Sequence, residues 1–259
     1  MKFLLTNDDG IESPGLDALV DVMKNYGEVY VVCPHQDKSA VGHSITVRNP
    51  LFIRETSKFG EDVKAWTVNG TPADCVKVAM EVLLPDQVDM VISGINMGAN
   101  IGRDCYYSGT IGAAREGVFY GVPAIAVSLD VTSKEMADFA EVKPLLSNTF
   151  GMLLNSQSGI KGLVSINLPN VKAGACKGVR FAELDFSIQR GRLQGEATSN
   201  AETIYWLKGA QLQLPLDMLN GDYRLLRDHY VTVTPLSVEM TDFARIKESE
   251  NDLSIRTKI

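Results

Sequence analysis

Short apolar runs alternate with helix-like segments over the first 130 residues, and this rhythm constrains the fold more than any other feature of the sequence. The apolar runs are Phe3–Leu5, Val29–Val32, Val88–Ile92 and Pro123–Leu129. Strands that alternate with helices are joined by right-handed crossovers and build a parallel sheet. The pattern therefore predicts an α/β fold with a doubly wound, mostly parallel sheet.

Two of the predicted helices carry a clear start signal. Ser13-Pro14 and Thr71-Pro72 each pair a capping residue with a proline at the first helical position. After Pro14 the apolar residues recur with helical spacing, at Leu16, Leu19, Val20 and Met23. Further helices are expected at residues 110–120 and near residues 135–155.

The alternation weakens after about residue 130. A strand at Leu163–Asn167 still fits the sheet, and Thr203–Leu207 and Val231–Leu236 are expected as later strands. Earlier in the chain, residues 45–47 and 51–53 flank Asn49-Pro50 and are expected to form a short hairpin. We expect one domain over residues 1–259, with residues of about 175–235 forming a β-rich C-terminal extension used in oligomer contacts.

Composition excludes several classes of protein. The chain has 259 residues, 45% of them hydrophobic, and a net charge of −7, so it has material for a large core but no excess of basic residues for nucleic acid or membrane surfaces. It has no apolar run near the roughly 20 residues of a membrane span, and its N-terminus reads as a strand rather than a signal peptide. Four dispersed cysteines without CxxC spacing suggest neither a zinc site nor a disulfide framework. We expect a cytoplasmic protein with no membrane and no stable nucleic-acid partner.

Two adjacent carboxylates follow the first predicted strand, in Asn7-Asp8-Asp9-Gly10. Two such charges about 4 Å apart repel by on the order of 4 kcal/mol at an effective dielectric near 20. A cation between them converts that repulsion into attraction, and hard oxygen donors favour Mg²⁺, Mn²⁺ or Ca²⁺. The alternative for so short a motif is a solvated acidic turn, because Asp and Gly are common turn residues.

Two more loops follow predicted strands. In the segment 34–46, Ser39 and Gly42 can bring a hydroxyl and exposed amides to the site, whereas His35 and His43 are given no catalytic role. In the segment 93–114, Asn96 offers a neutral oxygen. Ligands bind outside the carboxyl ends of parallel strands, so the three loops are expected to converge on one crevice.

The start of the helix at residues 108–110 predicts an anion site. Ser108, Gly109 and Thr110 open a helix whose first amides are expected to be free to bind phosphate without Lys or Arg. The segment lacks the Gly-Lys-Ser/Thr of a Walker A loop, and it does not match the dinucleotide-binding GxGxxG pattern. A divalent metal facing a phosphate is the interpretation that unites the three loops.

Several motifs, in this order along almost the whole chain, resemble the stationary-phase survival protein SurE family of metal-dependent nucleotidases. They are Leu5–Gly10, the Ser39 loop with Ser44-Ile45-Thr46, Gly70–Val76, Ser93–Asn100, Tyr107–Thr110 with Gly112-Ala113-Ala114, and Thr234-Pro235-Leu236. Two departures are Met97, where many members have His, and Arg115 near the start of the helix.

The resemblance implies a Rossmann-like core with a β-rich C-terminal extension, assembled as a homodimer or homotetramer. It implies hydrolysis of nucleoside 5'- and 3'-monophosphates with one divalent ion per subunit, Mg²⁺ or Mn²⁺. By position, the family's metal ligands correspond to Asp8, Asp9, Ser39 and Asn96. Its phosphate cradle corresponds to Ser108, Gly109 and Thr110, with Asn96 beside the substrate.

These residues suggest a mechanism in which the metal polarises the phosphate and acidifies a water, with Asp8 and Asp9 as catalytic residues. One carboxylate would ligate the metal and the other would orient or deprotonate the water. A rival enzyme would form a phosphoaspartate on Asp8, although the Asp-x-Asp spacing expected of such phosphatases is absent. A non-catalytic metal- and nucleotide-binding sensor is the alternative from another class.

Overall fold

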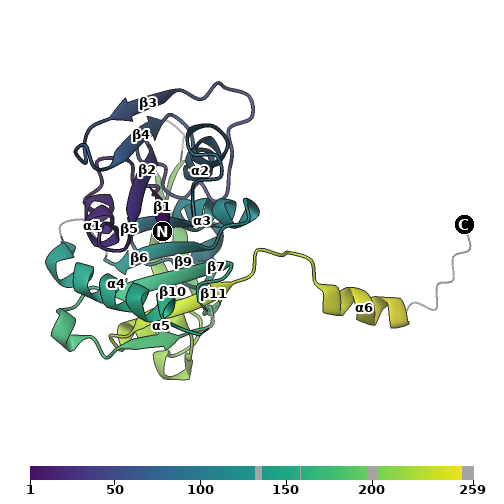
Figure 1. Cartoon of the computed structure of the whole chain (residues 1–259). Helices are drawn as coiled ribbons and strands as arrows, with labels where there is room; N and C mark the ends of the chain where they lie inside the picture. The colour runs from purple at the N-terminus through teal and green to yellow at the C-terminus, as the bar shows by residue number, and fades with distance from the viewer. Residues whose placement is uncertain (132–135, 158, 198–202, 253–259) are drawn as a thin grey trace, which may run out of the picture.

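A nine-stranded sheet forms the centre of the protein in the computed structural model, which describes residues 1–131, 136–157, 159–197 and 203–252 (Figure 1). Its strand order is β3-β4-β2-β1-β5-β6-β7-β11-β8. Neighbouring strands are parallel except in the pairs β3–β4 and β7–β11. The strands are β1 (Lys2–Thr6), β2 (Glu28–Pro34), β3 (Ile53–Thr56), β4 (Lys64–Val68), β5 (Met90–Met97), β6 (Ala124–Asp130), β7 (Leu163–Pro169), β8 (Val179–Phe181) and β11 (Val231–Leu236). The predicted Rossmann-like, mostly parallel sheet is confirmed.

Helices cover both faces of this sheet, as a doubly wound fold requires. Helices α1 (Pro14–Met23) and α4 (Phe139–Leu154) pack on one face, and α2 (Pro72–Val78) and α3 (Gly109–Phe119) pack on the other. Strand β1 serves both cores, because Phe3 faces α1 and α4 while Leu4 faces α2 and α3. The ring of Phe150 in α4 meets the Phe3 ring edge-on, with centroids 5.8 Å apart.

The predicted helix starts at the two prolines are confirmed. Helix α1 begins at Pro14 and α2 begins at Pro72. Before α2, the Thr71 hydroxyl accepts a hydrogen bond from the Asp74 amide, and the Asp74 carboxylate accepts one from the Thr71 amide. This reciprocal cap satisfies two amides that the first turn would otherwise leave unpaired. A π-helical turn, Ala79–Leu83, continues α2.

The direction of chain winding reverses between β1 and β5. From β1 the sheet grows through β2 and β4 on one side, and through β5, β6 and β7 on the other. The carboxyl ends of β1 and β5 therefore lie side by side where the connections diverge, which is where open parallel sheets bind ligands.

Two local expectations were wrong. Residues 45–47 form no strand, and β3 instead pairs with β4 in an antiparallel arrangement. Strand β5 extends to Met97, so Ser93 and Asn96 lie within a strand rather than in the loop after it. The pairing of β5 with β6 shifts between these two residues, and this irregularity lets a glycine-containing segment stay in the sheet.

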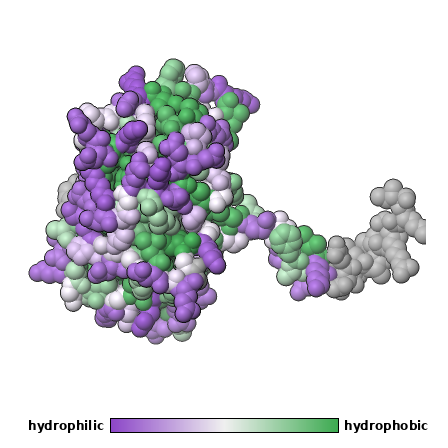
Figure 2. Space-filling view, in the orientation of Figure 1, coloured by the Kyte–Doolittle hydropathy of each residue, from purple (hydrophilic) through white to green (hydrophobic). Residues whose placement is uncertain are grey.

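The C-terminal third divides between the main sheet and a separate hairpin. Strands β8 and β11 form one edge of the main sheet. Strands β9 (Ile188–Ala197) and β10 (Thr203–Leu212) pair with each other in a separate two-stranded sheet. Helix α5 (Asp222–Arg227) precedes β11, and α6 (Phe243–Asp252) lies at the end of an arm that leaves the body (Figure 1). Phe243 and Ile246 of that helix are exposed. Figure 2 shows both hydrophobic and hydrophilic surface on the arm that carries it. Within the described residues, no helix has the length and apolar character needed to cross a membrane.

Candidate active site

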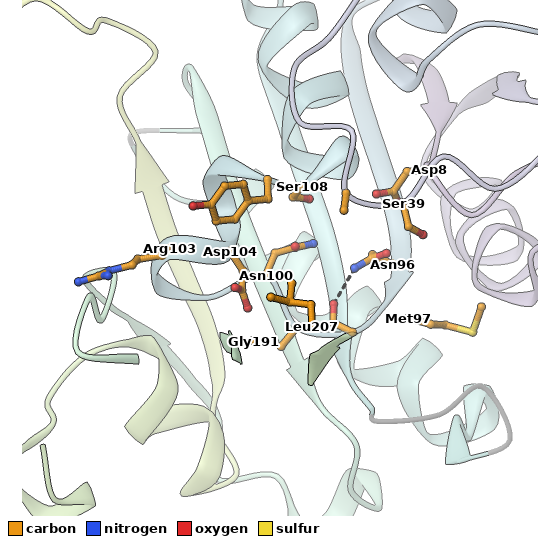
Figure 3. A pocket seen from close by; sticks show the side chains of 14 residues that line it. Asp8, Ser39, Asn96, Met97, Asn100, Arg103, Asp104, Ser108, Gly191 and Leu207 are labelled. Carbon is orange, nitrogen blue, oxygen red and sulfur yellow. Dashed lines mark hydrogen bonds between the residues drawn. The ribbon is translucent and has the colours of Figure 1, made fainter. Parts of the chain in front are cut away.

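A cavity of about 720 Å³ lies at the carboxyl ends of β1 and β5 (Figure 3). It brings together segments that lie up to 199 positions apart in the chain, from Asp8 to Leu207. Its lining residues are Asp8, Ser39, Ala40, Asn96, Met97, Gly98, Ala99, Asn100, Arg103, Asp104, Tyr107, Ser108, Gly191 and Leu207. Four of the predicted site residues, Asp8, Ser39, Asn96 and Ser108, thus face one space.

The turn after β1 is fixed by its own asparagine. The Asn7 side-chain amide donates to the Gly10 carbonyl at 2.8 Å, and the Gly10 amide donates to Asn7 Oδ1 at 3.1 Å. Gly10 has a φ of +92°, a left-handed conformation that favours glycine. The closed turn holds Asp8 and Asp9 at the end of the strand, and Asp9 Oδ2 accepts a hydrogen bond from the Met97 amide of β5.

Asp8 is buried, with only 3% of its surface exposed. Thr110 supplies two hydrogen bonds to its carboxylate, from Oγ1 at 2.6 Å and from the amide at 3.2 Å. Burial nevertheless raises the pKa of Asp8 to about 6, opposed by the Thr110 hydroxyl and reinforced by the charge of Asp9. The negative charge is thus incompletely compensated by the protein, and a bound cation would stabilise it.

The start of α3 does not present free amides as the sequence predicted. The Thr110 amide is bonded to Asp8, and the Ile111 amide donates to the Ser108 hydroxyl at 3.1 Å. The expectation of free amides is therefore wrong for these two residues, because the protein's own carboxylate and cap occupy them. Gly109 lies directly behind Asp8, where an added Cβ would come within 2.9 Å of Asp8 Cβ.

Ser39 and Asn96 reach the cavity from different elements. The Ser39 side chain is exposed, and its hydroxyl and amide both donate to Asp37 Oδ1, at 2.6 and 2.8 Å. The Asn96 side-chain amide donates to the Gly98 carbonyl at 2.7 Å, which fixes the orientation of its oxygen (Figure 3). In Figure 3 Asp8, Ser39 and Asn96 lie on the same side of the cavity, away from Arg103.

This donor set fits a hard divalent cation. Asp8, Asp9, Ser39 and Asn96 offer only oxygen ligands, the kind that Mg²⁺ and Mn²⁺ prefer. In the part of the chain that the structure describes, no cluster of three or more His, Cys, Asp or Glu side chains offers another metal site. A cation here would depend on the neutral oxygens of Ser39 and Asn96 to complete the coordination that the two aspartates begin.

Sequence reasoning missed several residues of the cavity wall. Arg103 and Asp104 lie between the glycine-containing segments 93–102 and 107–114, and this position could have indicated that they line the same cavity. Gly191 and Leu207 come from the β9–β10 hairpin, and nothing in their local sequence indicates that they face Asp8. Met97, noted only as a departure from the family pattern, lines the cavity and donates its amide to Asp9.

Known proteins resemble this chain over nearly its whole length. The model of the family described as Survival protein SurE matches residues 3–190. A 5'-nucleotidase SurE of Desulforudis audaxviator (strain MP104C) is 36% identical over 244 residues, which are 94% of this chain and 94% of the relative. A 5'-nucleotidase SurE of Clostridium botulinum (strain ATCC 19397 / Type A) is 35% identical over 251 residues, which are 96% and 98% of the two chains.

The fold agrees with this relationship. The crystal structure of the SurE protein from Aquifex aeolicus is 33% identical and superposes with a TM-score of 0.82, covering 97% of this chain and 100% of that one. The sequence matches and the superposition extend across the strands and loops that build the cavity. The chain therefore belongs to the survival protein SurE family.

Proposed function

We propose that this protein is a divalent-metal-dependent phosphomonoesterase that hydrolyses nucleoside 5'- and 3'-monophosphates to nucleoside and phosphate. The relatives named 5'-nucleotidase SurE, at 35–36% identity over nearly the full length, support this activity. The observation that carries it is the buried, incompletely compensated carboxylate of Asp8 at the end of a cavity of about 720 Å³. A cavity of that size accommodates a small organic phosphate.

One divalent ion, Mg²⁺ or Mn²⁺, would be held by Asp8, Asp9, Ser39 and Asn96. Nucleotidases of this family depend on metal in general, and the all-oxygen donor set agrees with that dependence. When bound, the ion would supply Lewis-acid activation of the phosphoryl group and of the attacking water.

The protein's own residues would divide the remaining work. Thr110 holds the Asp8 carboxylate by two hydrogen bonds. One of Asp8 and Asp9 would ligate the ion, and the other would orient the attacking water and accept its proton. The Ser108 hydroxyl accepts a hydrogen bond from the Ile111 amide and lines the cavity, so its own O–H would be available to donate to a phosphoryl oxygen. Ser108 and Gly109 would form the phosphate cradle with Asn96 at its side, while Thr110 contributes by holding Asp8.

Phosphate release by the purified protein tests this function. With Mn²⁺, AMP and GMP should be hydrolysed, and a chelator should stop the reaction. Asp8→Asn and Asp9→Asn should each lower kcat by at least roughly a hundredfold, while circular dichroism and the melting temperature stay close to wild type. Arg54→Gln, on the distant edge strand β3, is the matched control and should retain full activity.

Two results would contradict the proposal in different ways. Nucleotide binding without phosphate release would indicate a sensor. A trapped, acid-stable phosphoenzyme that disappears in Asp8→Asn would indicate a covalent aspartyl intermediate instead of direct attack by water.

We also propose that the chain assembles as a homodimer or homotetramer and that it is cytoplasmic. Leu193, Ile204 and Tyr205 of the β9–β10 hairpin are exposed, and an apolar surface of this kind supports a role of residues 175–235 in a homodimer or homotetramer. Light scattering of the full chain should give a mass of two or four subunits, and a monomer at micromolar concentration would contradict this. The four cysteines are unpaired, which agrees with a cytoplasmic location.

A further inference from the structure

We propose that His43 is a positioning residue: its hydrogen bond to Glu116 on helix α3 sets where Ser39 lies in the metal site. The inference rests on the metal site of the proposed function, and it extends that site to a histidine and a glutamate that no motif assigned to it. His43 does not line the cavity. It acts through the segment 39–43 that connects it to Ser39.

His43 contacts α3 through both its polar edge and its ring face. Its Nε2 lies 2.7 Å from Oε2 of Glu116, whose side chain is only 9% exposed. The His43 ring stacks on Phe119, with centroids 5.3 Å apart. Lys77 of α2 lies 3.4 Å from the other carboxylate oxygen, so the buried charge of Glu116 is balanced from its far side. A buried carboxylate with two defined partners holds the imidazole in one position.

The backbone beside His43 lies directly against the same helix. The Gly42 amide donates to the carbonyl of Tyr107, two residues before α3 begins, at 2.9 Å. At Gly112 of α3, an added Cβ would come within 2.6 Å of the Gly42 carbonyl oxygen and 3.0 Å of His43 Cα. The loop is therefore docked on α3. Thr110 of the same helix also holds Asp8, so helix α3 positions both Asp8 and the loop that carries Ser39.

Ser39 makes no side-chain hydrogen bond outside its own loop among those that the structure describes. Its side chain is exposed and its hydrogen bonds go to Asp37 of the same loop. Upstream, the Lys38 amide donates to the Asp8 carbonyl at 2.7 Å, and downstream the next anchors are Gly42 and His43. Ala40 between them has a φ of +56°, a left-handed conformation that a non-glycine residue holds only when its surroundings impose it.

Loss of the His43 anchor should therefore loosen the loop that carries Ser39, which remains tied by its backbone at Lys38 and Gly42, without dismantling the site. Asp8 and Asn96 keep their own hydrogen bonds to Thr110 and Gly98. Residues that support a ligand in this way typically change metal affinity by roughly tenfold to a hundredfold when replaced. The expected signature is weaker metal binding that depends on the presence of the Ser39 hydroxyl.

A double-mutant cycle on the full chain tests this, with Mn²⁺ affinity measured by isothermal titration calorimetry. His43→Asn is too short to reach Glu116 and should weaken Mn²⁺ binding by roughly tenfold or more. His43→Gln places an amide nitrogen near the position of Nε2 and should restore most of the affinity. His35→Asn, an exposed histidine earlier in the same segment, is the matched control and should leave the affinity unchanged.

The decisive comparison is made in the Ser39→Ala background. There His43→Asn should have almost no further effect on Mn²⁺ affinity, because the ligand that it positions is gone. An equal loss in both backgrounds would overturn the proposal, and so would a lower melting temperature with unchanged affinity. Binding is measured without turnover, so a wild-type protein that binds Mn²⁺ but releases no phosphate refutes the proposed function while the cycle still decides the role of His43.

Discussion

At the scale of single residues, the burial of Asp8 separates the two interpretations that the Asp8-Asp9 pair allowed. A solvated acidic turn would leave its carboxylates in water, whereas Asp8 is 3% exposed and bonded to the hydroxyl of a residue 102 positions away. Burial of an ionised carboxylate is costly unless hydrogen bonds or a cation compensate it. Thr110 therefore has a structural role in the metal-free protein as well as a role in the site.

The Thr110 hydroxyl should make a measurable contribution to stability without metal. Thr110→Val keeps the shape of the side chain but removes the donor to Asp8, and should lower the free energy of unfolding by about 1.5–3 kcal/mol above pH 7, where the carboxylate is ionised. Thr110→Ser retains the donor and should cost only about 0.8 kcal/mol for the lost methyl group. Urea unfolding in the presence of chelator measures both, and equal losses for the two variants would count against the assigned hydrogen bond.

At the scale of elements, helix α3 organises the site. Its first turn holds Asp8, Glu116 on its later turns holds His43, and its glycines let neighbouring segments approach closely. The sequence was sufficient to predict this helix and its start at residues 108–110, because the signals that begin a helix are local. It was not sufficient to predict that the helix amides bind Asp8, because that contact joins residues far apart in the chain.

Gly112 tests whether the spacing between α3 and the Ser39 loop matters. In Gly112→Ala the new methyl group would lie 2.6 Å from the Gly42 carbonyl oxygen, and the loop must move away. We expect a loss of roughly 1–3 kcal/mol in the free energy of unfolding and a disproportionate fall in Mn²⁺ affinity. Gly151→Ala in α4, where the new methyl group would meet the Tyr26 hydroxyl at 3.5 Å, is the matched control and should be neutral or slightly stabilising. If Gly112→Ala and Gly151→Ala have the same stability and the same Mn²⁺ affinity, the Ser39 loop moves away from α3 at no cost and the prediction is wrong.

At the scale of the whole molecule, a hairpin distant in sequence completes the cavity. The parallel sheet and the convergence of three loops at its carboxyl edge were predictable, because both follow from the strand–helix rhythm. The contribution of Gly191 and Leu207 to the cavity was not predictable. They belong to a two-stranded hairpin that does not pair with the main sheet, so no strand register places it relative to Asp8. Contacts at its base contribute to its position, and one buried carboxylate makes two of them.

Asp222 at the start of α5 is that carboxylate. It is fully buried and accepts hydrogen bonds from the amides of Gly102, at 2.9 Å, and of Asp185, at 3.0 Å. Gly102 begins the segment that carries Arg103 and Asp104 into the cavity, and Asp185 precedes the hairpin. Burial raises the pKa of Asp222 from 3.8 to about 6, against the effect of these hydrogen bonds.

The raised pKa predicts how stability changes with pH. Well below pH 3.8 Asp222 is protonated in both the folded and the unfolded chain, and between about pH 3.8 and 6 only the unfolded chain loses the proton. The contribution of Asp222 to the free energy of unfolding should therefore fall by about 2 kcal/mol as the pH rises from 4 to 7. Urea unfolding of wild type and Asp222→Asn across this range should show wild type losing stability relative to the variant. Asp228→Asn is the control with the opposite sign, because Arg224 lowers the pKa of Asp228 and its contribution is lost as the pH falls. A difference between wild type and Asp222→Asn that does not change with pH would mean that Asp222 is held as an ordinary ionised carboxylate by its amide donors.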